Sequence, residues 1–380
     1  FFVGHGAVRS QVMGRENRPP TTAELSEMKT IVAQAMQEGA LGLSTGLFYV
    51  PGTYANTDEV VELSKVAAEY GGVYESHIRD ESNYNIGLIA AVQEVIDISR
   101  RAEIPVHIAH IKALGVDLWG QSQAVISLIE EAQAEGMQIS ADQYPWLASG
   151  IQIHKAIVPS WALEGTEEEI QARLNDPELL PTIKEEMTEN IRRRGGPDSL
   201  LVVISPDQSL EGNTLAGLAN QWDMPAVDAA LKILSLGVIE PWTRVASFNM
   251  SEADVEAFMA EPWVMTSSDG TNGHPRKYAS FANKYRQYVA DKPVLTPQQF
   301  VHRSSALVAE TFSIAERGYL RADYFADIAI IDPQNYRPGA DFANWNELAT
   351  GVEYVFVNGA AAIVDSEPQP IFVGRSLRRN

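Results

Sequence analysis

Four short apolar segments recur along the first part of the chain at an interval of about 32 residues. They begin near residues 41, 73, 105 and 137, and a stretch with helical periodicity separates each from the next. Parallel strands need a crossover of a dozen or more residues, so this spacing predicts successive parallel β–α units. Four units in a row predict an α/β fold, either a TIM-like (β/α)8 barrel or a doubly wound sheet.

Polar residues stand where each predicted strand ends. They are Ser44 and Thr45, then His77, His110 and Asp142. In a barrel the functional groups lie at the carboxyl ends of the strands, so this succession favours a barrel with a polar site. The alternative is that polar residues end these strands by chance.

Three polar residues suit metal-assisted hydrolysis. They are His77, His110 and Asp269, and Asp269 follows a further predicted strand at residues 263–268. A catalytic metal that activates water needs neutral imidazoles, a carboxylate and an open position. Spacing alone is weak support, because a histidine at a strand end is more often a hydrogen-bonded structural residue. His107 lies three residues before His110, and strand alternation predicts that only one of the two faces the barrel interior. We expect that one to be His110.

Composition and charge limit the classes of partner that the protein can bind. The 380 residues carry a formal net charge of −21, which disfavours nucleic acid and anionic membranes as partners. The sequence has no run of about 18 apolar residues that would predict a membrane-spanning helix. It has no cysteine, so neither a disulfide nor a thiolate zinc site can form within it. The compartment and the oligomeric state are left open.

Seven ordered motifs resemble those of the N-acyl-D-amino-acid deacylases (D-aminoacylases) of the amidohydrolase superfamily, and the resemblance covers nearly the whole chain. The motifs are Val3-Gly4-His5-Gly6 with Arg9; Gly39 to Leu47 with Tyr49, Pro51-Gly52 and Tyr54; Ser76-His77-Ile78-Arg79 with Glu81; His110-Ile111-Lys112; Asp142-Gln143-Tyr144-Pro145; Ser268-Asp269-Gly270; and His274-Pro275-Arg276.

The resemblance implies an activity and a site. The activity is zinc-dependent hydrolysis of the amide bond of N-acyl-D-amino acids, which releases a carboxylate and a D-amino acid. His77 and His110 match zinc ligands on barrel strands 5 and 6. Asp269 matches the strand 8 aspartate that takes a proton from water and passes it to the leaving amine. The residues that match those holding the substrate, chiefly its α-carboxylate, are Lys112, Tyr144 and Arg276. A guanidinium, an ammonium and a phenol suit that task.

The sequence departs from the family at the metal site. The family has a His-x-His pair on strand 1 and a cysteine or another bridging ligand on strand 2, and neither is present among these residues. If Val3-Gly4-His5 forms strand 3, strands 1 and 2 lie upstream of Phe1. We therefore expect an incomplete barrel that carries part of the ligand set for one or two zinc ions.

The remaining segments predict two additions to the barrel. Residues 164–199 are rich in Glu, Arg and Lys, which predicts an exposed helical insertion. After Arg317 the sequence alternates like strands, and Asn358-Gly359 is a hairpin turn signal. We expect a barrel domain over residues 1–315 and a small C-terminal β domain over residues 316–380.

Two other functions fit parts of the pattern. A related cyclic amidohydrolase, such as a dihydroorotase or hydantoinase, would use a similar metal site. A catalytically inactive binding protein of the same fold would explain why some ligands are absent from this sequence. The cationic grip expected from Lys112 and Arg276 favours a linear N-acylated amino acid as the small-molecule substrate.

Overall fold

The computed structural model describes residues 1–378, and the last two residues of the predicted C-terminal domain lie outside the described residues. Its centre is a six-stranded parallel sheet in the order β1-β2-β3-β4-β5-β9. The strands are β1 (Val3–Gly4), β2 (Gly42–Gly46), β3 (Val73–His77), β4 (Val106–Ile108), β5 (Ile139–Gln143) and β9 (Val264–Thr266). Within the described residues β1 and β9 are the two edges, so the sheet is open, as the sequence predicted.

Helices on the outer side connect the strands and bury one main core. They are α1 (His5–Met13), α2 (Thr22–Gln37), α3 (Thr57–Glu69), α4 (Leu88–Ala102) and α5 (Ser122–Ala134). The capping box predicted at Thr21 is present, since its side chain accepts from the Glu24 amide while Glu24 accepts from the Thr21 amide. Apolar faces of these helices pack on the strands in a single cluster that includes Val32, Val92 and Ile129.

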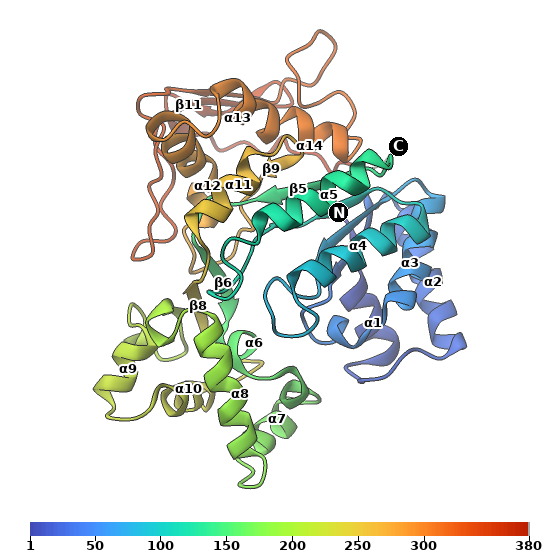
Figure 1. Ribbon diagram of the computed structural model, residues 1–380. Coiled ribbons are helices and arrows are strands. Elements are labelled where there is room, and N and C mark those ends of the chain that lie inside the picture. Colours follow the sequence, from blue (N-terminus) through green and yellow to red (C-terminus); the bar gives the residue numbers. More distant parts are fainter. Residues whose placement is uncertain (379–380) are drawn as a thin grey trace.

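Residues 148–248, called the insertion below, form a separate lobe between β5 and β9 (Figure 1). Its elements are β6 (Ala148–Gln152), α6 (Ile153–Ile157), α7 (Glu167–Leu174), α8 (Leu180–Arg193), β7 (Leu200–Ile204), α9 (Leu215–Gln221), α10 (Ala226–Leu234) and β8 (Arg244–Phe248). The strands pair antiparallel in the order β6-β8-β7, and the lobe has its own apolar core. The predicted helical segment, residues 164–199, contains α7 and α8, so the lobe extends beyond the predicted bounds.

Helix α11 (Glu252–Ala260) leads from the insertion to β9. After β9 the chain continues through α12 (Arg276–Tyr285), α13 (Pro297–Ser304) and α14 (Ala306–Thr311). The tail forms a four-stranded antiparallel sheet from β10 (Ile328–Ile331), β11 (Val352–Val357), β12 (Ala360–Val364) and β13 (Glu367–Pro368). Asn358 and Gly359 both have positive φ and join β11 to β12, as the turn signal predicted. We propose that the boundary between the barrel domain and the C-terminal β domain lies near residue 315.

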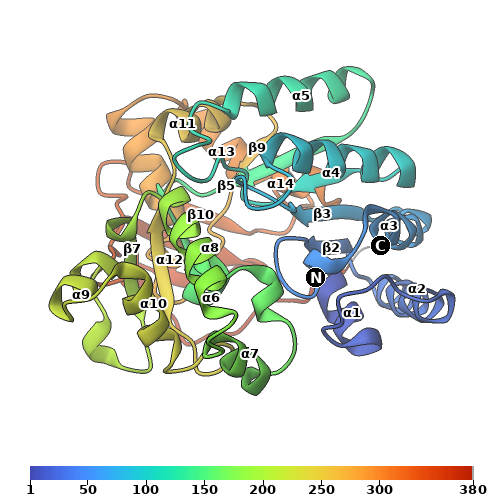
Figure 2. The same ribbon diagram turned by 60° about the horizontal axis from the view of Figure 1, so that its bottom comes forward.

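The turned view shows α2–α5 grouped on one side of the molecule and α6–α10 on the other (Figure 2). Two apolar clusters correspond to these groups, one built on the parallel sheet and one inside the insertion. Among residues 1–378, no helix combines the length and the apolar character that a membrane crossing requires.

Candidate active site

A cavity of about 330 Å³ lies where the strands of the parallel sheet end and the insertion begins. The strand side contributes His77, Glu81 and His110, and the loop after β9 contributes Asp269. The insertion contributes residues of β6, α6 and β8 to the opposite wall. A larger cavity of about 820 Å³ adjoins it and shares Phe48, Tyr49 and Tyr84 in its lining.

The structure brings His77 and His110 together. Nδ1 of His77 lies 2.9 Å from Nε2 of His110, although the residues come from different strands. Burial lowers the pKa of His77 to about 3, so its imidazole is neutral and keeps a lone pair. Burial and Lys112 also disfavour the charged form of His110, but Glu81 and Asp269 outweigh them and raise its pKa.

Glu81 completes a three-residue donor cluster with the two histidines. One ligand atom from each residue lies within 4.8 Å of the others. Glu81 Oε1 lies 3.0 Å from His110 Nδ1 and also forms an ion pair with Lys112 Nζ. Burial opposes the charged carboxylate, yet Lys112 and the histidines hold the pKa of Glu81 well below its ordinary value. Glu81 belongs to one of the matched motifs, but no role was predicted for it from the sequence.

His110 and Asp269 share an unusual backbone conformation. Their φ values are +40° and +41°, in the left-handed region that non-glycine residues seldom occupy. The His110 amide donates to Asp142 Oδ1 at 2.8 Å, and Ser267 Oγ donates to the same oxygen at 2.5 Å. Asp142 therefore fixes the His110 backbone after β4 and the Ser267 side chain after β9, two residues before Asp269.

Tyr144 is the centre of the predicted carboxylate grip. The Arg276 guanidinium carbon lies 4.6 Å from the centroid of its ring, and Lys112 Nζ lies 5.7 Å from it. Tyr144 Oη and Arg276 Nε are buried without a hydrogen-bond partner among residues 1–378. Buried polar atoms without partners are costly in a finished structure, so two such atoms in one cavity indicate a place for a polar ligand.

Gly150 makes room for the guanidinium of Arg276. A Cβ at residue 150 would lie 3.4 Å from Arg276 Nη2 and 3.2 Å from Thr271 Oγ1. A side chain at this position would press first on Thr271 and His274 and would extend toward the group that is expected to bind the substrate.

Asp269 lies in the same cavity but contacts Arg276 rather than the histidine pair. Its Oδ2 is 2.7 Å from Arg276 Nη1, and its side chain is about a third exposed. A guanidinium carries five N–H donors, so Arg276 can hold Asp269 with one edge while Nε remains free for a ligand. The sequence did not predict this ion pair, which joins the expected general base, Asp269, to Arg276 of the expected carboxylate site.

The prediction that His107 would face away from the interior is wrong. His107 pairs with Glu75 across β3 and β4, and Glu75 lies on the same strand face as His77. His107 Nε2 contacts Asp142 Oδ2 at 2.8 Å and its Nδ1 contacts Ser140 Oγ at 2.9 Å. Strand alternation does not extend to His110 because β4 ends at Ile108 and the positive φ turns His110 back to the cavity.

Three further cations of the cavity had no role assigned from the sequence: Lys155 on α6, Arg194 at the end of α8 and Arg244 at the start of β8. The fold of the insertion brings them to the cavity, and no motif contained them. His5, by contrast, belongs to a matched motif but lies away from this cavity, with its Nε2 2.8 Å from Glu59 Oε1.

The donor set fits a zinc ion. Two imidazole nitrogens and a carboxylate are the ligand types that zinc takes in catalytic sites. The neutral His77 keeps a lone pair for a metal, and its Nδ1 lies at hydrogen-bond distance from His110 Nε2, so both nitrogens are close enough to contact one ion.

No protein-family model matches the sequence. An N-acyl-D-glutamate deacylase from Alcaligenes xylosoxydans xylosoxydans is 30% identical over 388 residues, which cover all of this chain and 69% of the relative. A crystal structure of D-aminoacylase, described as defining a subset of amidohydrolases, aligns with a TM-score of 0.81 at 28% identity over 100% of this chain and 71% of its own. The N-acyl-D-glutamate deacylase of Bordetella bronchiseptica, complexed with zinc and a phosphonate inhibitor, aligns with a TM-score of 0.79 at 29% identity, covering 97% and 70%.

The parallel sheet, the histidine and carboxylate cluster at its strand ends and the likeness to these deacylases together place the chain among the metal-dependent amidohydrolases. Within that class, the 30% sequence identity to the N-acyl-D-glutamate deacylase over the full length of this chain shows the family. The chain belongs to the N-acyl-D-amino-acid deacylase family.

Proposed function

We propose that the protein hydrolyses the amide bond of N-acyl-D-amino acids with the help of zinc. One observation carries the proposal. The donor cluster of His77, Glu81 and His110 faces the same cavity as the unpartnered Tyr144 Oη and Arg276 Nε. A metal site and a carboxylate site in one cavity are what a linear acylated amino acid requires.

His77 and His110 would hold the zinc, which supplies Lewis-acid activation of a water molecule and of the acyl carbonyl. Asp269 accepts a proton from the attacking water and passes it to the leaving amine. Arg276, Tyr144 and Lys112 bind the α-carboxylate and so position the scissile bond. Glu81, the third member of the donor cluster, would complete the zinc ligand set, and its contacts with Lys112 and His110 keep those side chains in place.

The proposal predicts a zinc requirement and a stereochemical preference. Removal of zinc by a chelator should abolish hydrolysis of N-acetyl-D-leucine, and zinc should restore it, while N-acetyl-L-leucine remains uncleaved. His77→Asn should lower the zinc content and the turnover together. The measurements are amine release and metal analysis on the same samples.

His302→Asn is the matched control, since His302 is an exposed histidine on α13. It should leave zinc content and turnover unchanged. Full zinc content in His77→Asn would remove His77 from the ligand set, and equal cleavage of both enantiomers would contradict the proposed substrate class.

A further inference from the structure

Several cations in the lining of the two joined cavities have no acidic partner. Arg15, Lys155 and Arg244 each lie in this lining, and none of them has a carboxylate within ion-pair distance among residues 1–378. Arg194 also lines the smaller cavity, but its guanidinium donates to the Ala156 carbonyl and the Ser247 hydroxyl. The full chain carries 50 acidic and 29 basic residues, so acidic partners are abundant elsewhere. Arg15, Lys155 and Arg244 therefore lack an acidic partner in spite of that excess of acidic residues.

Arg244 is the most deeply placed of the three. Its exposed fraction is 9%, and its Nε has no hydrogen-bond partner among the described residues. Its guanidinium carbon lies 5.1 Å from the centroid of the Trp242 ring, which supports the side chain but leaves hydrogen-bond donors unused. Desolvation without compensating hydrogen bonds is costly for a cation, which indicates that a ligand supplies the acceptor.

Lys155 stands beside it at the junction of the two cavities. Its Nζ lies 5.1 Å from the centroid of the Tyr49 ring, and its pKa is lowered by burial and then by Arg244 and Arg15. An anion bound between these groups would remove that repulsion. Lys155 makes no ion pair with any residue in the part of the chain that the structure describes.

The position of Arg244 relative to Arg276 shows which part of a substrate would reach it. Nη1 of Arg244 and Nη2 of Arg276 both lie 3.4 Å from the carbonyl oxygen of Gly150. The second cationic group therefore adjoins the proposed α-carboxylate site. A substrate held by Arg276 would direct a substituent of its amino-acid half, not its acyl half, toward Arg244 and Lys155.

We infer that Lys155 and Arg244 form a second anion site that binds the side-chain carboxylate of an acidic D-amino acid. The inference rests on the proposed function and names the substrate class within it, an N-acyl-D-amino acid with two carboxylates. Arg276 and its neighbours take the α-carboxylate, and the insertion takes the side chain.

The test compares substrates that differ only in one charge. The zinc-loaded protein should have a kcat/KM for N-acetyl-D-glutamate about 10- to 100-fold above that for the neutral, nearly isosteric N-acetyl-D-glutamine, the range expected for one hydrogen-bonded charge. Lys155→Met and Arg244→Met should each reduce this ratio about tenfold or more, mainly by lowering activity on the acidic substrate. Arg244→Lys keeps the charge and should retain part of the preference if Arg244→Met fails to fold.

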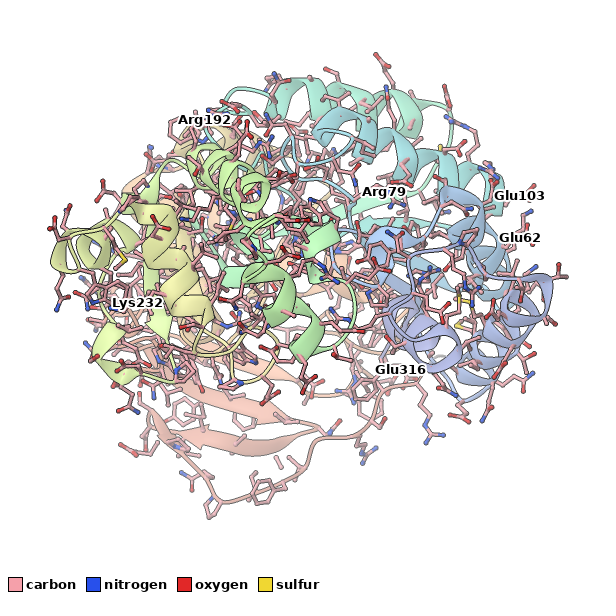
Figure 3. The ribbon with its side chains drawn as sticks, turned by 90° about the horizontal axis from the view of Figure 1, so that it is seen from below. Glu62, Arg79, Glu103, Arg192, Lys232 and Glu316 are labelled. Carbon is pink, nitrogen blue, oxygen red and sulfur yellow. The ribbon has the colours of Figure 1, made fainter. Side chains whose placement is uncertain are left out.

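Lys232→Met is the matched control. Lys232 also lies over an aromatic ring in the insertion, with Nζ 3.9 Å from the centroid of Trp222, but it lies on the margin of the molecule (Figure 3). Its removal should leave the ratio unchanged. A carboxylate on the acyl group is the other possible source of the anion, so N-succinyl-D-leucine is compared with N-butyryl-D-leucine.

The outcomes separate the inference from the proposed function. Efficient cleavage of neutral substrates with no preference for N-acetyl-D-glutamate would overturn the inference and leave the deacylase activity standing. A preference for the N-succinyl substrate would also overturn it. Calorimetric binding of D-glutamate in preference to D-glutamine, lost in Lys155→Met, would support the second site even if no substrate were cleaved.

Discussion

Two residues of the site have a backbone conformation that non-glycine residues seldom adopt. His110 and Asp269 both have φ near +40°, and a non-glycine residue in the left-handed region is an uncommon feature that often marks a functional site. Asp142 stabilises this geometry by accepting the His110 amide and the Ser267 hydroxyl. Both side chains are thereby turned into the cavity instead of continuing the alternation of their strands.

Asp269→Asn should separate chemistry from folding. Asparagine is nearly isosteric and can occupy the left-handed region, so the variant should fold and retain zinc. It cannot accept a proton from water, so kcat should fall by about 10² to 10⁴. KM should change less, because Lys112, Tyr144 and Arg276 remain.

Steady-state kinetics with zinc analysis on the same sample would measure this. A variant that retains more than about a tenth of wild-type kcat would exclude Asp269 as the general base. Arg276→Ala should act in the opposite manner and raise KM first.

At this scale the sequence predicted some contacts and missed others for definite reasons. The proximity of His77 and His110 could be predicted because His77 ends β3, His110 follows β4, and the two strands are parallel neighbours. The role of His107 could not be predicted, since alternation holds only to the last residue of a strand and the end of β4 depends on the turn at His110. The insertion cations could not be predicted either, because antiparallel pairing of β6 with β8 brings together residues 89 apart (244 minus 155).

Among the elements, α1 is fixed to α3 by a buried ion network. Glu59 Oε1 accepts from His5 at 2.8 Å and its Oε2 pairs with Arg9 at 2.5 Å, with all three side chains almost fully buried. Burial alone would raise the pKa of Glu59, but His5 and Arg9 outweigh it and lower that pKa. This network explains why the first matched motif contains His5 and Arg9, which lie outside the cavity.

Glu59→Gln should destabilise the protein by about 3–5 kcal/mol, because it leaves the buried Arg9 charge without a carboxylate partner. The free energy of unfolding from urea titration measures the effect. Glu62→Gln is the control on the same helix, since Glu62 joins Lys29 and Lys65 at the surface (Figure 3). It should cost less than about 1 kcal/mol. Equal losses in the two variants would contradict the structural role assigned to Glu59.

For the molecule as a whole, one buried lysine sets a dependence of stability on pH. Lys284 on α12 is fully buried, and its Nζ has no hydrogen-bond partner among the described residues. Burial, with a smaller effect of Arg303, lowers its pKa from 10.5 to about 7. Between these two pH values the unfolded chain binds a proton that the folded chain does not, so this residue makes stability rise with pH.

Lys284→Met should therefore stabilise the protein most at or below pH 7, by about 3–5 kcal/mol at one pKa unit per 1.4 kcal/mol. The gain should shrink toward zero as the pH approaches 10. The difference in Tm between variant and wild type at pH 6, 8 and 10 measures it. Lys277→Met, an exposed change on the same helix, should show no such trend. A variant that is less stable at every pH would show that the Lys284 amine has a stabilising partner.

The cavity has two walls made by different parts of the chain. Strand ends of the parallel sheet carry the donor cluster, while β6, α6 and β8 of the insertion carry Gly150, Lys155 and Arg244. The residues proposed for hydrolysis and the residues proposed for substrate selection thus lie in different segments of the sequence. Drift or engineering confined to residues 148–248 could retune which amino acid is accepted without disturbing hydrolysis, and a lobe transplanted between relatives would carry its preference with it.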